Sequence, residues 1–244
     1  MAKKTERPLH ENHRARMQER VARDGLESLA EHEALEYLLF LSIPRKDTNE
    51  LAHRLIQHFG SFCRVMEAEP EELQRVEGIG PRSANLIHTV MGFTRYYALK
   101  KRERGVALDS AERAIEYVKP FFLGQRNELL YLILLDDKCQ PVRDLCIAEG
   151  VPNRVHADAR KLVREVARTD ATCGILAHNH PTGLAIPSEA DRVATLGIMK
   201  ALEPLGVSII DHVIIAGEDA SSMRQRDCLP QCTSGIQILN AASR

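Results

Sequence analysis

The chain has 244 residues, of which 44% are hydrophobic and 27% are charged, and 33 Lys and Arg against 34 Asp and Glu give it a net charge of -1. This length buries one large core or two modest ones, and the near-neutral charge argues neither for nor against a nucleic-acid partner. The apolar runs are too short for a membrane-spanning helix, and the basic start lacks the apolar segment of a secretory signal. We therefore expect a cytoplasmic protein with reduced cysteines, in which only Cys228 and Cys232 are close enough for a local pair.

The first part of the chain has a helical pattern. Apolar residues recur at three- and four-residue spacing in residues 33–43 and 49–59, and each segment is followed by a break, at Pro44 and at Gly60. This pattern predicts a small all-α domain over residues 1–105.

A glycine turn at Gly78-Ile79-Gly80 joins two amphipathic helical stretches. Glycine permits a sharp turn, and the amides that begin the second helix could bind an anion such as a DNA phosphate. The same residues could instead form a tight corner with Ile79 in the core. The flanking residues Leu73, Val76, Ala84 and Ile87 resemble the helix-hairpin-helix module, and this resemblance implies contact with the DNA backbone at Gly78 and Gly80, without sequence preference.

A basic run, KKRER, follows from Lys100 to Arg104 and is next to Gly105. Its composition is typical of a linker between two domains. Basic side chains neutralise phosphates, so we expect Lys100, Lys101 and Arg102 to strengthen non-specific DNA binding.

The second part of the chain changes to an α/β pattern, which predicts a domain over residues 106–228. Residues 128–150 contain an apolar strand, a polar turn near 136–141 and a second strand. The remaining predicted elements are a helix at 159–167, a strand at 172–180, a helix at 191–202 and a strand at 207–217. Residues 229–244 have no convincing period and are expected to form a loose tail.

The strand at 172–180 ends in His178-Asn179-His180. Side chains alternate along a strand, so both imidazoles project from one face. After a turn, Ser188 begins the next helix as its N-cap, and Asp191 lies one turn in. Two His and one Asp leave the fourth position of a tetrahedral zinc to water, as in a catalytic site. Alternatively, these residues bind no metal and form a polar loop in which Ser188 and Asp191 are an ordinary capping pair.

The spacing His-x-His, seven residues, Ser, two residues, Asp matches the JAMM motif of the MPN metallopeptidases. The stretches HNHPTG, PSEAD and VSIIDHVIIAG resemble the RadC family in particular, and the resemblance extends over about residues 8–228. It implies an α/β JAMM/MPN-like domain of the cytidine-deaminase-like type, preceded by a small all-α helix-hairpin-helix domain. The implied activity is zinc-dependent hydrolysis of an amide or isopeptide bond in a protein or peptide.

The resemblance also implies roles for residues near the metal. Glu128, at the start of an early strand, corresponds to the general base that acts through a zinc-bound water. Glu149, at the end of the next strand, is the alternative. Ser188 corresponds to the serine that stabilises the oxyanion. Asp211 and His212 are expected to make structural hydrogen bonds rather than to support the metal ligands.

Two functions of other classes compete with a hydrolase. The chain could be a DNA-binding accessory protein in which the metal only stabilises the scaffold. It could also be a nuclease, but two-metal phosphodiester chemistry would need a second carboxylate-rich position, and the sequence pattern offers none.

Overall fold

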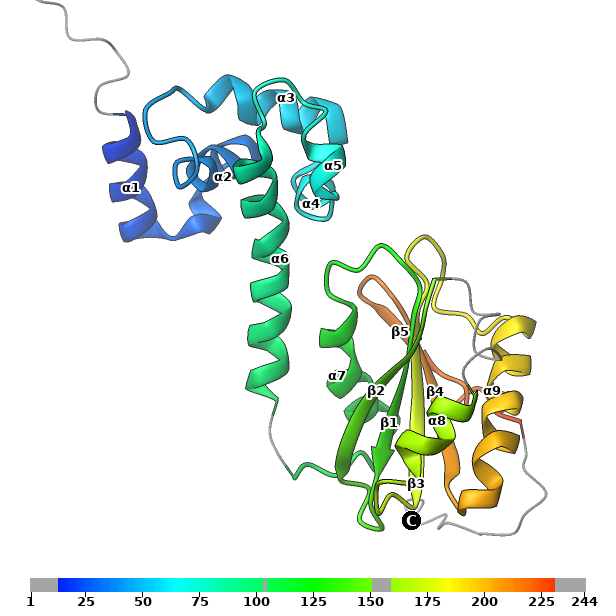
Figure 1. Cartoon of the computed structure of the whole chain (residues 1–244). Helices are drawn as coiled ribbons and strands as arrows, with labels where there is room; N and C mark the ends of the chain where they lie inside the picture. Colours follow the sequence, from blue (N-terminus) through cyan, green and yellow to red (C-terminus); the bar gives the residue numbers. More distant parts are fainter. Residues whose placement is uncertain (1–12, 103–104, 151–158, 231–244) are drawn as a thin grey trace, which may run out of the picture. The chain divides into compact units, whose positions relative to one another are not determined.

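The computed structural model describes residues 13–102, 105–150 and 159–230. The chain forms two compact units, Met1–Tyr97 and Ala98–Arg244, called here the helical unit and the sheet unit (Figure 1). The division between the two units falls within the long helix α6 (Pro81–Lys101), whereas the sequence predicted a domain boundary at residue 105. The predicted tail lies largely outside the described residues.

The helical unit is built around one apolar core. Its described elements are α1 (His13–Asp24), η1 (Leu26–Ser28), α2 (Glu31–Leu39), α3 (Asn49–Phe59), α4 (Phe62–Met66), α5 (Pro70–Leu73) and most of α6 (Pro81–Lys101). The predicted helices at 33–43 and 49–59 correspond to α2 and α3. Helix α3 stops at Gly60 because this residue has a left-handed backbone, with φ of 92°, that glycine adopts without strain.

The turn between α5 and α6 packs its central residue into that core. Gly78 has φ of 96°, and Ile79 is only 6% exposed. The flanking residues Leu73, Val76, Ala84 and Ile87 belong to the same buried cluster. The predicted helix, turn and helix are therefore present, and the apolar spacing fixes the corner.

Helix α6 corrects the prediction of a linker at Lys100–Arg104. Its 21 residues include Lys100 and Lys101, which lie in its last turn. Arg102, the other basic residue of this run that the structure describes, directly follows the helix. Basic side chains in the last turn of a helix interact favourably with its dipole, so Lys100 and Lys101 favour the extension of the helix to residue 101.

The sheet unit contains a five-stranded mixed sheet in the order β2-β1-β3-β4-β5. Strands β3 and β4 are parallel and the other neighbouring pairs are antiparallel. The strands are β1 (Leu129–Leu135), β2 (Pro141–Glu149), β3 (Cys173–Asn179), β4 (Ser208–Ala216) and β5 (Asp219–Ser222). The sequence did not predict β5, because DASS lacks the apolar alternation of a strand.

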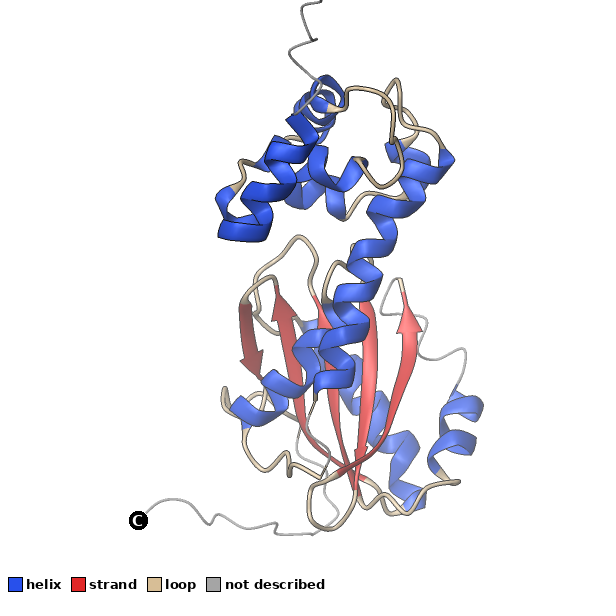
Figure 2. Cartoon of the chain, turned by 90° about the vertical axis from the view of Figure 1, so that its left-hand side faces the viewer, coloured by secondary structure: helices blue, strands red, loops and turns tan. Residues whose placement is uncertain are grey.

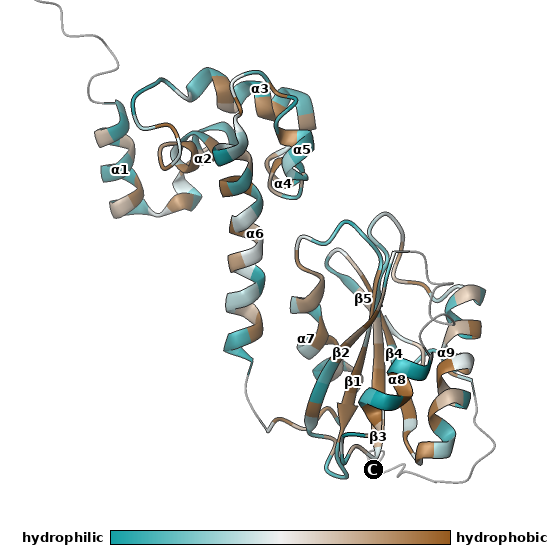
Figure 3. Ribbon diagram, viewed as in Figure 1, coloured by the Kyte–Doolittle hydropathy of each residue, from teal (hydrophilic) through white to brown (hydrophobic). Residues whose placement is uncertain are grey.

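Helices cover both faces of this sheet (Figure 2). On one face lie α7 (Ala111–Val118), which the sequence did not predict, and η2 (Lys119–Phe122). On the other lie α8 (Ala159–Val166) and α9 (Glu189–Leu202), which leads into η4 (Glu203–Leu205). Burial on both sides explains why β1 and β3 are almost continuously apolar (Figure 3).

The predicted fold class is confirmed: a helical N-terminal region precedes a mixed α/β sheet domain. Within the described residues, no helix combines the length and the apolar character needed to cross a bilayer. The five described cysteines are free thiols, and Cys232 lies outside the described residues.

Candidate metal centre

The site is built where strand β3 ends and helix α9 begins. His178 lies between Leu130 of β1 and Ile214 of β4 in the sheet register. The parallel pairing continues one step past the strand, because the His180 amide donates to the Ile215 carbonyl at 2.7 Å. The backbone of both histidines is therefore held by neighbouring strands.

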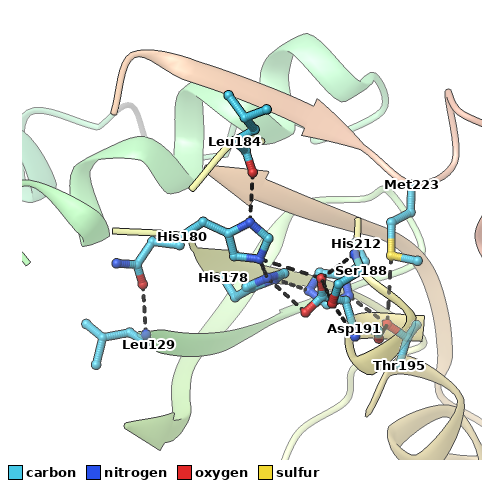
Figure 4. Close-up of polar contacts among 10 residues, drawn as sticks. Leu129, His178, His180, Leu184, Ser188, Asp191, Thr195, His212 and Met223 are labelled. Atoms are coloured by element: carbon cyan, nitrogen blue, oxygen red, sulfur yellow. Dashed lines mark hydrogen bonds and ion pairs between the residues drawn. The ribbon is translucent and has the colours of Figure 1, made fainter. Parts of the chain in front are cut away.

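Three ligand atoms converge at this point (Figure 4). The Nε2 atoms of His178 and His180 are 2.8 Å apart, and they lie 3.1 Å and 3.5 Å from the two carboxylate oxygens of Asp191. Ligands about 2 Å from a tetrahedral zinc are separated by about 3.3 Å. The three side chains therefore fit a zinc ion with one position left for water or substrate.

The protonation of His180 follows from its other nitrogen. Its Nδ1 lies 2.8 Å from the carbonyl oxygen of Leu184, which can only accept, so Nδ1 carries the proton. Gly183 allows the chain to fold back over this ring, because a Cβ there would come within 3.3 Å of the His180 Cβ. Ala185 anchors the loop by packing with Ile214 and Met223.

The protonation of His178 is fixed through a buried chain of hydrogen bonds. The Thr195 hydroxyl lies 2.6 Å from the Asp191 carbonyl oxygen and therefore donates to it. Thr195 then accepts from Nδ1 of His212 at 2.7 Å. The remaining Nε2 of His212 accepts from Nδ1 of His178 at 2.8 Å. With Nδ1 of His178 as the donor, its Nε2 faces the ligand cluster with a lone pair.

Burial keeps His212 neutral, because it lowers the pKa of this imidazole well below the usual value. Two Nε2 lone pairs only 2.8 Å apart repel unless a cation lies between them. The donor set is therefore suited to a metal ion on chemical grounds.

Asp191 is held in place by a capping box with Ser188. The Ser188 hydroxyl and amide both donate to Oδ2 of Asp191, at 2.6 Å and 2.7 Å, and the Asp191 amide donates back at 3.2 Å. Burial alone would raise the pKa of Asp191. The two hydrogen bonds that Ser188 donates to the carboxylate favour its ionised form, and the pKa of Asp191 lies well below the usual range.

The two carboxylates considered as a base lie on opposite faces of the sheet. Leu130 pairs with His178, so the register extended by two residues brings Glu128 opposite His180, on the face of the ligands. Glu128 is half-buried. Glu149 pairs with Leu129 and therefore faces the other side of the sheet, where it is exposed.

Sequence reasoning missed the role of Asn179, the middle residue of the His-x-His pattern. It is 4% exposed, and its carboxamide accepts from the Leu129 amide at 2.7 Å and donates to the Asn127 carbonyl at 3.0 Å. These bonds hold the backbone on both sides of Glu128. A buried side-chain carboxamide at the end of a strand needs hydrogen-bond partners, and the backbone nearby supplies them. This requirement could have predicted the role of Asn179 from the sequence.

The prediction for Asp211 agrees with the structure, but the one for His212 is corrected. Asp211 accepts from the His212 amide and the Ser222 hydroxyl, both at 2.6 Å, and therefore ties β4 to β5. His212 instead contacts a ligand ring, because β4 is the parallel neighbour of β3. This pairing between distant segments is not visible in local spacing.

The residues predicted to bind DNA are not brought together. Gly80 and Lys100 lie at opposite ends of α6, about 30 Å apart at 1.5 Å per residue. Arg102 pairs with Asp144 at 3.0 Å and covers the rings of Tyr117 and Phe121 at 4.1 Å and 4.6 Å. These contacts leave Arg102 partly buried, whereas Lys100 and Lys101 are exposed, and contact of these three residues with DNA stays a prediction.

Family models match most of the chain. The model for the RadC-like JAB domain matches residues 108–228, and the model for the UPF0758 N-terminal region matches residues 9–85. The first range contains the whole ligand cluster, and the second contains the turn at Gly78–Gly80.

Proposed function

The chain belongs to the RadC family, and from this premise we propose that it is a zinc-dependent hydrolase that cleaves an amide or isopeptide bond. One observation carries the proposal. The His178 and His180 rings both direct an Nε2 lone pair toward the point that the Asp191 carboxylate also faces, and the fourth side of this cluster has no protein ligand among the described residues.

A zinc ion held by these side chains would supply Lewis acidity to the substrate carbonyl and to a water molecule. Glu128 accepts the proton that the attacking water loses and returns it to the leaving amine. This role is supported by the strand register and by the hold of Asn179 on the adjacent backbone. Ser188 donates to the developing oxyanion after its hydroxyl turns away from Asp191.

The surroundings of the centre favour a peptide substrate over a nucleic acid. Leu184 and Ile186, in the loop between the ligands, are 67% and 52% exposed and offer apolar contact to side chains near a scissile amide. Among the described residues there is one group of potential metal ligands, so support for a two-metal nuclease is lacking.

The test combines metal analysis with a cleavage screen. Purified full-length chain should contain about one zinc per molecule. With zinc it should release products from a library of peptides and isopeptide-linked lysines, and a chelator should stop the release. Zinc binding without cleavage of any amide would instead favour the non-catalytic scaffold.

The helical unit supports a second proposal, non-specific binding of duplex DNA at the Gly78–Gly80 turn. A Cβ on Gly80 would meet no atom within 4 Å, and this residue is not in the left-handed region. The fold therefore does not require glycine there, although it does at Gly78, where φ is 96° and Leu51 lies 3.2 Å from an added Cβ. Close approach of a phosphate to the backbone amides would explain why residue 80 is a glycine.

The matched variants are Gly80→Val and Gly92→Val, because a Cβ at either position meets no atom within 4 Å; Gly80 directly precedes α6 and Gly92 lies within it. We expect Gly80→Val to weaken retention of duplex DNA in a gel shift, while Gly92→Val binds like wild type. With about three phosphates neutralised, log affinity should fall with log salt at a slope of roughly -3. Equal binding by both variants would remove the turn as a phosphate site.

A further inference from the structure

Helix α6 differs in charge from the rest of the described helices. Its 21 residues include Arg82, Arg95, Lys100 and Lys101 and no Asp or Glu. Every other described helix of eight residues or more carries at least one acidic side chain. A long helix without carboxylates presents a positive field along its length and is suited to a polyanion.

The two sides of α6 are distinct. Ser83, Ala84 and Ile87 are buried in the core of the helical unit. Phe93, Tyr96 and Tyr97 are 70%, 60% and 66% exposed, although rings of this size are usually covered.

The aromatic rings share their side of the helix with cations. At about 100° per residue, Arg82, Phe93, Tyr96 and Lys100 fall within an arc of about 60°, and Tyr97 lies about 40° beyond one edge of it. Charge and exposed rings therefore coincide on one face, which we call the aromatic face.

We propose that the aromatic face of α6 binds single-stranded nucleic acid. Unpaired bases offer their flat sides to exposed rings, whereas the bases of a duplex are already stacked on one another. Arg82 and Lys100 would neutralise phosphates on either side of the rings. The inference uses side chains other than the Gly78–Gly80 turn and does not depend on the proposed hydrolase.

The test measures the anisotropy of a labelled oligothymidine of about 20 nucleotides with the full-length chain. Replacing both Phe93 and Tyr96 with Ala should weaken binding by at least about tenfold, because each base loses its stacking partner. The control is Leu41→Ala, which removes an apolar side chain of similar exposure, 67%, from elsewhere in the helical unit and should change nothing.

Tyrosine emission gives an independent readout. The chain has no Trp and five Tyr, so quenching by added oligothymidine reports on tyrosine directly. Replacing Tyr96 and Tyr97 with Leu should abolish most of the quenching. All these positions are exposed, so thermal melting of the variants should match wild type.

The outcomes separate this proposal from the others. If the Phe93 and Tyr96 double variant binds oligothymidine as tightly as wild type, the proposal is overturned. If it changes only the sedimentation of the protein, the face is a contact between copies, and the proposal is overturned as well. Gly80→Val should leave oligothymidine quenching intact, so failure of the duplex site and failure of the aromatic face are distinguishable.

Discussion

The metal centre and the aromatic face of α6 carry their chemistry in opposite ways. At the centre, His178 and Asp191 are each 4% exposed, and the donors and acceptors around them constrain one another. On α6, Phe93 is 70% exposed. A buried polar site reveals its ligand through geometry, because every buried polar atom needs a partner. An exposed site indicates its ligand only through the types of side chain that it presents to solvent.

The largest expected effect breaks the metal centre and spares α6. His178→Ala removes one of three ligands, and we expect the purified protein to lose its zinc and all hydrolysis while oligothymidine binding stays unchanged. The control is His88→Ala, which removes an exposed imidazole from α6 and should keep full zinc content. Elemental analysis measures the zinc content of both variants. Zinc retained in His178→Ala would indicate that cysteines bind the metal instead.

The next effect distinguishes two carboxylates within the sheet unit. Glu128→Gln should keep the metal but reduce hydrolysis by a factor of about 10² to 10⁴, the usual contribution of a general base. Glu149→Gln should do much less, because its side chain leaves from the opposite face of the sheet. Turnover of a peptide found in the screen ranks the two, and the reverse order would assign the base to Glu149.

A smaller effect tests how the surroundings orient a ligand. Thr195→Val removes the hydroxyl that accepts from His212 and leaves a buried N–H without its partner. We expect zinc affinity to fall by about 10- to 100-fold, as for the loss of other groups that orient metal ligands. Thr195→Ser keeps the hydroxyl and should restore the affinity, measured by competition with a chromogenic chelator. If Val and Ser behave alike, the hydrogen-bond chain has no influence on the metal.

The sequence was sufficient where the pattern is local. Two histidines on one strand face and a carboxylate one turn into a helix follow from the alternation of strands and from helix capping, so His178, His180 and Asp191 could be found without coordinates. Thr195 and His212 could not, because they meet only after a parallel crossover brings β4 beside β3.

Surface charge was harder to interpret than the ligand motif. In the sequence, the basic residues of the run that begins at Lys100 look equivalent. In the structure, Lys100 and Lys101 belong to the helix, whereas the next residue, Arg102, packs on aromatic rings. Strand β5 escaped prediction because its side chains are small and polar. Its pairing with β4 is supported instead by Ser222 and Asp211.

The smallest expected effect separates two neighbouring cations of that run. Lys101→Ala should leave the melting temperature unchanged and reduce the salt slope of duplex binding by about 0.9, the contribution of one phosphate contact.

Arg102→Ala should do the opposite. It loses the ion pair with Asp144 and the contact with Tyr117, so we expect the sheet unit to lose on the order of 1 to 2 kcal/mol of unfolding free energy. The loss stays moderate because Asp144 still accepts from the Tyr117 hydroxyl at 3.0 Å. The salt slope of Arg102→Ala should equal that of wild type. Denaturant titration and gel shifts on both variants give the comparison, and a reduced slope for Arg102→Ala would show that this residue contacts DNA despite its packing on the rings.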